Sequence, residues 1–340
     1  MTKEMVDNAS ASAGTGADGT AVDLPPTEMI YYTYQGNFEL GCDSKILSCQ
    51  FINNNENNSN NKEEDTQLQQ QEIHLCLDRT VLHAQGGGQP TDTGSIQIIG
   101  EGGGTSKKIS ITKVVLDRTT GVATHMGYTS SLSSKCSLIG CEKVRVMVDS
   151  KNRRILSECH TAGHVVDMAM AQWAMENNDS SKTLMPPTKA YHYLDGPYVE
   201  YKGSIPIEKR KVVLEKIQAL FQELVKNDIA TEIHNVSLLE AEKMCYEDNA
   251  FVKGEGNNYY RLREQFGTNA TDATDDANDA DNDDATMVRI VRVAGWPCAC
   301  GGTHVNSTSD LKHNNWGITG FKCKKGRVRV KYNQHWNATK

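Results

Sequence analysis

The hydrophobic and polar positions divide the chain into a strand-rich first part and a second part that contains helices. Between residues 28 and 150, short apolar or alternating stretches recur between Gly- or Ser-rich turns, a pattern that predicts strands. The first predicted strand starts at Glu28 and includes Ile30, Tyr31, Tyr32 and Tyr34; the others lie at residues 73–77, 96–99, 109–116 and 144–148. We therefore expect residues 28–150 to be mostly β.

Helical spacing begins near residue 151. Residues 154–175 contain no proline and place apolar side chains three or four positions apart. Residues 208–228 place an apolar stripe on one helix face, formed by Val213, Ile217, Leu220 and Leu224. A third helix is expected at 238–246, strands at 287–293 and 328–332, and a strand–turn–strand unit at 191–201. Residues 151–340 are thus predicted to be α+β, with helices on an antiparallel sheet.

Three segments lack the apolar residues that a core requires. Residues 1–27 are rich in Ala, Gly, Ser, Thr and Asp, residues 52–72 are mostly Asn, Gln and Glu, and residues 268–286 contain seven Asp. We expect a disordered N-terminus, a low-complexity insert and an acidic insert. The two folded domains are then a β-rich glycine-loop domain (28–150) and an α+β domain (151–340).

The formal net charge of −7 is unevenly distributed. The two inserts carry enough acidic residues to leave the remainder mildly basic, so the global charge does not exclude an RNA partner. No run of 18 apolar residues exists, which excludes a membrane span by helix, and the N-terminus lacks the apolar core of a signal peptide. Ten Cys without regular spacing indicate reduced thiols in the cytoplasm rather than a disulfide framework.

Two motifs contain histidines and cysteines at spacings that are typical of metal ligands. His160 and His164 stand four positions apart on a predicted helix, so both imidazoles lie on one face; the simpler alternative is two histidines that merely share that face. A zinc peptidase motif would need Glu at position 161, which is Thr. In the second motif, Cys298 or Cys300 and His304 flank a glycine turn, and spacing alone leaves both cysteines open. Together the motifs supply a His, His, Cys, His set suited to tetrahedral zinc.

Two further stretches contain candidate binding residues. Three consecutive glycines at 86–88 permit a close backbone approach, but the loop lacks the Lys-Ser/Thr of a phosphate-binding P-loop, and a hairpin turn is the simpler prediction. The C-terminal stretch 321–332 has six basic residues and no acid. Its alternation places Arg327, Arg329 and Lys331 on one face of a strand, where they could bind phosphates. The alternative is a solvent-exposed edge strand whose charges prevent aggregation.

These residues together resemble alanyl-tRNA editing proteins of the AlaX type, which are akin to the editing domain of alanyl-tRNA synthetase. The resemblance rests on Gly-Gly-Gln-Pro-Thr-Asp-Thr-Gly at 87–94, His-Thr-Ala-Gly-His at 160–164, the segment 191–201, and Cys-Gly-Gly-Thr-His at 300–304. The second metal motif of the family matches Cys300 rather than Cys298. Gly163 departs from the family pattern, in which a larger apolar residue is common, and in a helix it costs about 1 kcal/mol relative to Ala.

The resemblance implies a zinc-dependent hydrolase that removes Ser, and sometimes Gly, from mischarged tRNA(Ala). It also implies a small barrel-like β domain before an α+β editing domain, without room for ligase activity. The implied zinc ligands are His160, His164, Cys300 and His304. Gln89 and Thr161 are candidates to position the amino acid or a water. The basic C-terminal stretch predicts the donors to tRNA phosphates, which are Lys322, Lys324, Lys325, Arg327 and Arg329.

Two alternatives come from other functional classes. A translation termination factor also uses a Gly-Gly-Gln loop for ester hydrolysis, but it would leave the His and Cys residues unexplained. A non-enzymatic, zinc-stabilised RNA-binding module is the stronger alternative, because four protein ligands are typical of a closed structural zinc site.

Overall fold

The computed structural model of the chain describes residues 23–52, 70–99, 105–129, 143–176, 185–247, 249, 262 and 286–336. The predicted disordered N-terminus and the two predicted inserts lie almost entirely outside these residues. The chain divides into two compact units. One comprises residues 1–31, 39–85 and 91–150, and the other comprises residues 32–38, 86–90 and 151–340.

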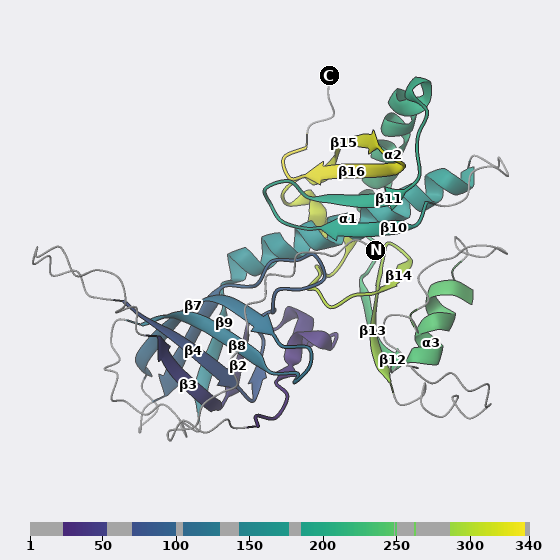
Figure 1. Cartoon of the computed structure of the whole chain (residues 1–340). Coiled ribbons are helices and arrows are strands. Elements are labelled where there is room, and N and C mark those ends of the chain that lie inside the picture. The colour runs from purple at the N-terminus through teal and green to yellow at the C-terminus, as the bar shows by residue number, and fades with distance from the viewer. Residues whose placement is uncertain are drawn as a thin grey trace, which may run out of the picture. The chain divides into compact units, whose positions relative to one another are not determined.

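The first unit is built on a curled antiparallel sheet (Figure 1). Its seven strands run in the order β2-β9-β6-β7-β8-β4-β3, and a short parallel pair, β1-β5, accompanies it. The strands are β1 (Glu28–Met29), β2 (Gly41–Ser44), β3 (Ile46–Ile52), β4 (Gln71–Leu77), β5 (Arg79–Thr80), β6 (Gly94–Ile99), β7 (Thr105–Leu116), β8 (Ala123–Thr129) and β9 (Val144–Val148). The last four strands predicted from the sequence are confirmed as β4, β6, β7 and β9, whereas β2, β3 and β8 were not predicted.

The first predicted strand is wrong beyond Met29. The chain there forms two 3-10 turns, Ile30–Tyr32 and Gly36–Phe38. Tertiary contacts override the local β propensity, because the Tyr31 ring is buried edge-to-face against His83 at 5.2 Å. The Tyr31 hydroxyl also accepts a hydrogen bond from the Ala84 N–H.

The second unit is α+β, as predicted. Its elements are α1 (Ser150–Glu176), β10 (Pro187–Tyr191), β11 (Tyr198–Lys202), α2 (Arg210–Lys226), β12 (Glu232–Ser237), α3 (Leu238–Glu242), β13 (Met287–Val293), β14 (Trp296–Ala299), β15 (Gly317–Lys324) and β16 (Arg327–Asn333). Short 3-10 turns cover Ile207–Lys209 and Thr308–Lys312, and α3 continues into a π turn, Lys243–Glu247. The four residues predicted to form the apolar stripe of α2 are all buried.

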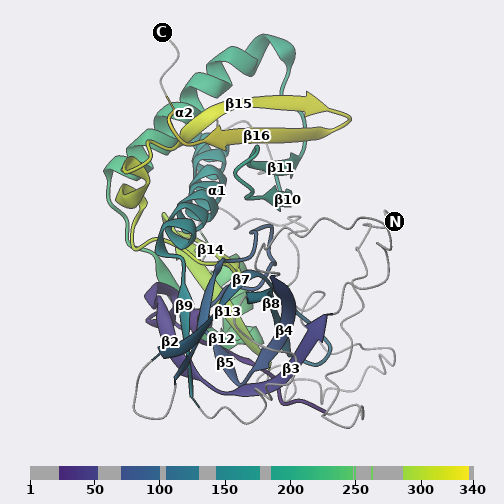
Figure 2. The same cartoon turned by 90° about the vertical axis from the view of Figure 1, so that its left-hand side faces the viewer.

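A four-stranded antiparallel sheet, ordered β10-β11-β16-β15, forms the larger layer of this unit (Figure 2). Alternation along the strands gives it two different faces. Val199, Val328 and Val330 are buried in one core with residues of α1 and α2. Arg327, Arg329 and Lys331 lie on the opposite, exposed face, which confirms the predicted alternation.

A three-stranded meander, β12-β13-β14, completes the unit and carries the second metal motif at the end of β14. Its side chains Val288 and Ile290 pack with α3 in a smaller core. Among the helices in the described part of the chain, none combines the length and apolar character needed to cross a bilayer.

Candidate metal centre

Four side chains from the two sequence motifs converge in the second unit. One ligand atom from each of His160, His164, Cys300 and His304 lies within 4.8 Å of the others. The three histidines are buried, and Cys300 is half-buried. The structure therefore brings together all four predicted ligands.

Two distances between these ligand atoms match those expected around a tetrahedral zinc ion. The Cys300 Sγ lies 3.4 Å from His160 Nε2 and 3.4 Å from His304 Nε2. Typical Zn–N and Zn–S bond lengths place ligand atoms about 3.5 Å apart at tetrahedral angles. Imidazole and thiolate ligands are also the types that select zinc over hard cations.

Helix α1 supplies the histidine pair because it is unbroken across the motif. His160 and His164 stand one turn apart, and their rings stack with centroids 5.1 Å apart. Cys300 and His304 come from the glycine turn after β14. Gly302 is required there, because a Cβ at this position would lie 2.1 Å from the His160 ring.

Gln89 holds His160 in one orientation. The Gln89 Oε1 lies 2.6 Å from His160 Nδ1, and the same oxygen accepts the Thr303 backbone N–H at 3.0 Å. Because an amide oxygen only accepts, Nδ1 of His160 carries the proton, and the lone pair of Nε2 is left for a metal. Gln89 is fully buried, and it contacts the ring nitrogen of His160 that is not available to the metal.

The loop that presents Gln89 is a tight hairpin turn, as its glycines predict. Gly86 and Gln89 exchange two backbone hydrogen bonds, of 3.2 and 2.9 Å. Gly87 and Gly88 both have positive φ, 59° and 76°, as a type I′ turn requires. A Cβ at Gly88 would lie 2.6 Å from the Ala190 carbonyl oxygen, so the turn can approach β10 only with glycine at this position.

Two polar side chains position His304. The Thr161 hydroxyl lies 3.3 Å from His304 Nδ1 and accepts the Val305 N–H. Both of these partners lie outside the helix that carries Thr161. Asn37 binds the His304 backbone twice, donating to the carbonyl at 2.8 Å and accepting from the N–H at 3.0 Å. Sequence reasoning missed Asn37, which carries no local signal.

The two cysteines differ in their neighbours. The Cys298 Sγ lies 3.4 Å from His164 Nδ1 but is not among the four converging ligands. Burial raises the pKa of the Cys300 thiol, and the positive charge of Arg289 lowers it. Arg289 also donates to the Cys300 carbonyl at 2.5 Å. Burial, aided by the same arginine, lowers the pKa of His164 to about 4, so this ring is neutral and able to bind a metal.

His192 is a buried histidine beside the cluster that the sequence did not single out. Its ring stacks on His160 with centroids 4.2 Å apart, and its Nδ1 lies 2.6 Å from the Tyr332 hydroxyl. Burial lowers the pKa of His192 to about 3. Gly163 explains how the ring fits, because a Cβ there would lie 2.3 Å from His192 Cε1. The departure of Gly163 from the family pattern therefore makes room for His192.

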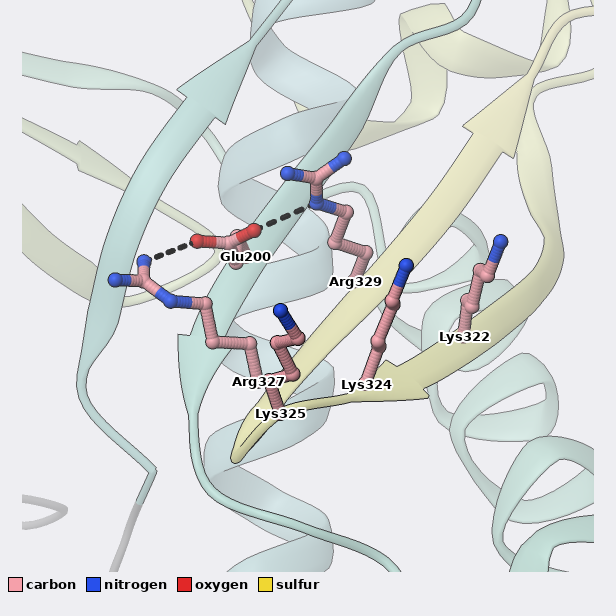
Figure 3. A pocket seen from close by; sticks show the side chains of 6 residues that line it. All are labelled: Glu200, Lys322, Lys324, Lys325, Arg327 and Arg329. Atoms are coloured by element: carbon pink, nitrogen blue, oxygen red, sulfur yellow. Dashed lines mark hydrogen bonds and ion pairs between the residues drawn. The ribbon is translucent and has the colours of Figure 1, made fainter. Parts of the chain in front are cut away.

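Five of the six basic residues of the β15–β16 hairpin line a hollow of about 340 Å³ (Figure 3). The buried Glu200 carboxylate lies between two guanidinium groups and accepts from Arg327 at 2.5 Å and Arg329 at 2.6 Å. The remaining lining residues are Lys322, Lys324 and Lys325. One buried carboxylate thus orders two arginines inside a surface of net positive charge.

The chain is similar to known tRNA-synthetase sequences. Residues 288–315, which include Cys300 and His304, match the family described as the threonyl and alanyl tRNA synthetase second additional domain. The alanine–tRNA ligase of Methanoregula boonei is 23% identical over 92% of this chain, and that of Halobacterium salinarum is 24% identical over 90%. Over most of its length the chain is therefore similar to alanine–tRNA ligases, and residues 288–315 match the second additional domain of such synthetases. This relationship confirms the resemblance inferred from the motifs.

The similarity covers only part of these synthetases. The chain spans about a quarter of the length of the curated relatives it matches, with 27% for the Methanoregula boonei ligase and 26% for the Halobacterium salinarum ligase. A Prochlorococcus marinus alanine–tRNA ligase is 27% identical over 71% of this chain. The matched part makes up 22% of the length of that ligase.

Proposed function

We propose that this protein is a zinc-dependent aminoacyl-tRNA deacylase that acts in the cytoplasm. Its substrate is tRNA(Ala) mischarged with Ser, and to a lesser extent with Gly, which it hydrolyses in trans. The observation that carries the proposal is the convergence of His160, His164, Cys300 and His304, two of which lie within the matched editing-domain segment.

The protein's own residues hold this centre in a fixed geometry. A zinc ion bound there would supply Lewis acidity at the ester carbonyl or at water. Gln89 holds the tautomer of His160, and Thr161 and Asn37 hold the ring and backbone of His304. These are positioning roles, and such partners behind metal ligands commonly affect activity as much as affinity.

The tRNA is proposed to bind through phosphate contacts on the exposed sheet face. Lys322, Lys324 and Lys325 are exposed there, beside the ordered pair Arg327 and Arg329. Binding of this kind weakens steeply with added salt because counterions are released. The selectivity for the amino acid is assigned to the metal centre, where a seryl hydroxyl can form hydrogen bonds that alanine lacks.

A second candidate function is a zinc-stabilised RNA-binding module without catalysis. Four protein ligands favour it, because catalytic zinc sites usually keep one open position. X-ray absorption of the zinc-loaded protein, with and without a non-hydrolysable seryl-tRNA analogue, separates the two. A coordination shell unchanged by the analogue, together with no deacylation, supports the structural role.

Deacylation of seryl-, glycyl- and alanyl-tRNA(Ala) by the purified protein tests the proposal. Seryl-tRNA should be hydrolysed faster than alanyl-tRNA, and His160→Ala and His304→Ala should each abolish the reaction. His234→Ala is the matched control, because this histidine lies in β12 outside the cluster and pairs with Glu232. Equal rates on the two esters, or hydrolysis that survives loss of a cluster histidine, would refute the assignment.

A further inference from the structure

Three tyrosines form a column of stacked rings on the four-stranded sheet of the second unit. Tyr191 in β10 pairs directly with Tyr198 in β11, and their ring centroids lie 5.5 Å apart at an interplanar angle of 22°. Tyr193 follows two residues after Tyr191 and stacks on it at 4.6 Å and 14°. All three side chains are half-buried, so part of the column is accessible to a ligand.

The column lies on the charged face of the sheet. Tyr198 alternates with the core residues Val199 and Tyr201 and therefore shares its face with Glu200. Across the β11–β16 pair, Glu200 lies opposite Arg329, whose Cζ is 4.8 Å from the centroid of the Tyr198 ring. Aromatic rings and guanidinium groups are thus continuous on one surface, which the hollow of Figure 3 extends.

This combination fits unpaired nucleotides better than a base-paired duplex. Single-stranded nucleic acids bind where aromatic side chains stack on bases and a positive groove follows the backbone. In a duplex the flat faces of the bases are covered, and recognition relies on phosphates and 2′-hydroxyls. Stacked tyrosines would add nothing to that kind of contact.

The same segment also reaches the metal centre. His192 stands between Tyr191 and Tyr193, and its side chain is buried on the other side of the backbone, stacked on His160 at 4.2 Å. A base that stacks on the tyrosines is therefore separated from the cluster by the thickness of one chain segment. The segment that carries the tyrosines therefore also packs against a predicted metal ligand.

We propose that the tyrosine column stacks the unpaired bases near the 3′ end of the bound tRNA at its Tyr193 end, with Tyr191 and Tyr198 supporting that ring from one side. The basic residues beside them contact the phosphates of the same strand. The inference rests on the proposed function in one respect, since it takes the bound strand to be the one that carries the ester. It adds a base-stacking site that favours single-stranded over duplex RNA.

Fluorescence anisotropy with the full chain tests the inference, using a labelled single-stranded oligoribonucleotide and a blunt RNA duplex of equal length. Tyr193→Ala should weaken binding of the single strand about tenfold and leave duplex binding unchanged. Tyr193→Phe keeps the ring and should bind as the parent protein does. Lys324→Ala is the contrasting variant, because loss of a phosphate contact weakens binding of both RNAs and reduces the salt dependence.

Zinc content and circular dichroism of each variant establish that the fold is retained, and Tyr198→Leu provides a second test of the column. Undiminished single-strand binding by both Tyr193→Ala and Tyr198→Leu, or an equal loss on the duplex, overturns the inference. Tyrosine-dependent single-strand binding without hydrolysis of any aminoacyl-tRNA would instead overturn the proposed function and support the stacking site.

Discussion

The Gln89 Oε1 lies 2.6 Å from His160 Nδ1, although 71 positions separate the two residues in the sequence. The glycine turn that precedes Gln89 and the helix that carries His160 meet at this hydrogen bond. Through this hydrogen bond the glycine turn positions a predicted metal ligand. A histidine that binds a metal generally donates its second ring N–H to an acceptor of this kind.

Removing this support should weaken metal binding without removing a ligand. Gln89→Ala leaves the His160 Nδ1–H without its acceptor, and we expect the zinc dissociation constant to rise about ten- to hundredfold. Competition with a chromophoric chelator measures this change. Gln89→Glu is the matched control, because it retains an acceptor oxygen for His160 and should lose less affinity than Gln89→Ala. Equal zinc affinity in Gln89→Ala and the parent would contradict the positioning role.

The two neighbouring cysteines should differ in their effect on zinc content. Cys300 lies 3.4 Å from two cluster nitrogens, whereas Cys298 contacts the Nδ1 of His164. Cys300→Ala should therefore lose the single zinc ion, and Cys298→Ala should retain it, as elemental analysis of the purified variants would show. Full zinc occupancy in Cys300→Ala would disprove the ligand assignment.

Gly163 and His192 should be energetically coupled. Alanine at an exposed helical position gains about 1 kcal/mol over glycine, but a Cβ at Gly163 would lie 2.3 Å from the His192 ring. Overpacking of this kind costs about 1–3 kcal/mol, so Gly163→Ala should lower the free energy of unfolding measured in urea.

The double variant Gly163→Ala/His192→Ala tests the cause of that loss. Without the imidazole the closest clash is removed, and only the Tyr332 hydroxyl, 2.9 Å from the added Cβ, stays close. Gly163→Ala should therefore destabilise the His192→Ala background less than it destabilises the parent. If Gly163→Ala destabilises both backgrounds equally, the two residues are not coupled and the steric explanation fails.

The first unit should become less stable in mild acid because of His125. This ring is fully buried, between the Leu75 carbonyl and the Thr80 hydroxyl, and burial lowers its pKa from 6.5 to about 4. Between these pH values the unfolded chain binds the proton and the folded chain does not. The stability contribution is therefore complete above pH 6.5 and is lost as the pH falls towards 4, by up to about 3 kcal/mol.

Urea unfolding at a series of pH values measures this dependence. His125→Asn cannot titrate in this range, so its free energy of unfolding should fall less steeply than that of the parent between the two pKa values. Parallel pH profiles for the variant and the parent would show that His125 titrates normally in the folded protein.

Local periodicity determines much of the secondary structure. The unbroken helical spacing after residue 151, the apolar stripe of α2 and the alternation of β16 each depend on neighbours in the sequence. The same is true of the His160–His164 pair, because a helix alone places side chains four positions apart on one face. The alternation predicted for β13 is wrong, because this strand is buried on both faces. Ile30–Tyr32 shows the limit, since the burial of Tyr31 against His83 overrides its local β propensity.

Only the tertiary structure decides how the site is assembled. Asn37 meets His304 across 267 positions, and no local pattern marks it. The glycine motif marks Gln89, but not its hydrogen bond to Thr303 across 214 positions. The sequence around His192, between Tyr191 and Tyr193, likewise gives no sign that its ring stacks on His160 in the folded protein. Sequence by itself determines which elements form and which residue types they carry. The packing of distant elements determines which polar groups meet, because a buried donor or acceptor must find its partner wherever the fold places one.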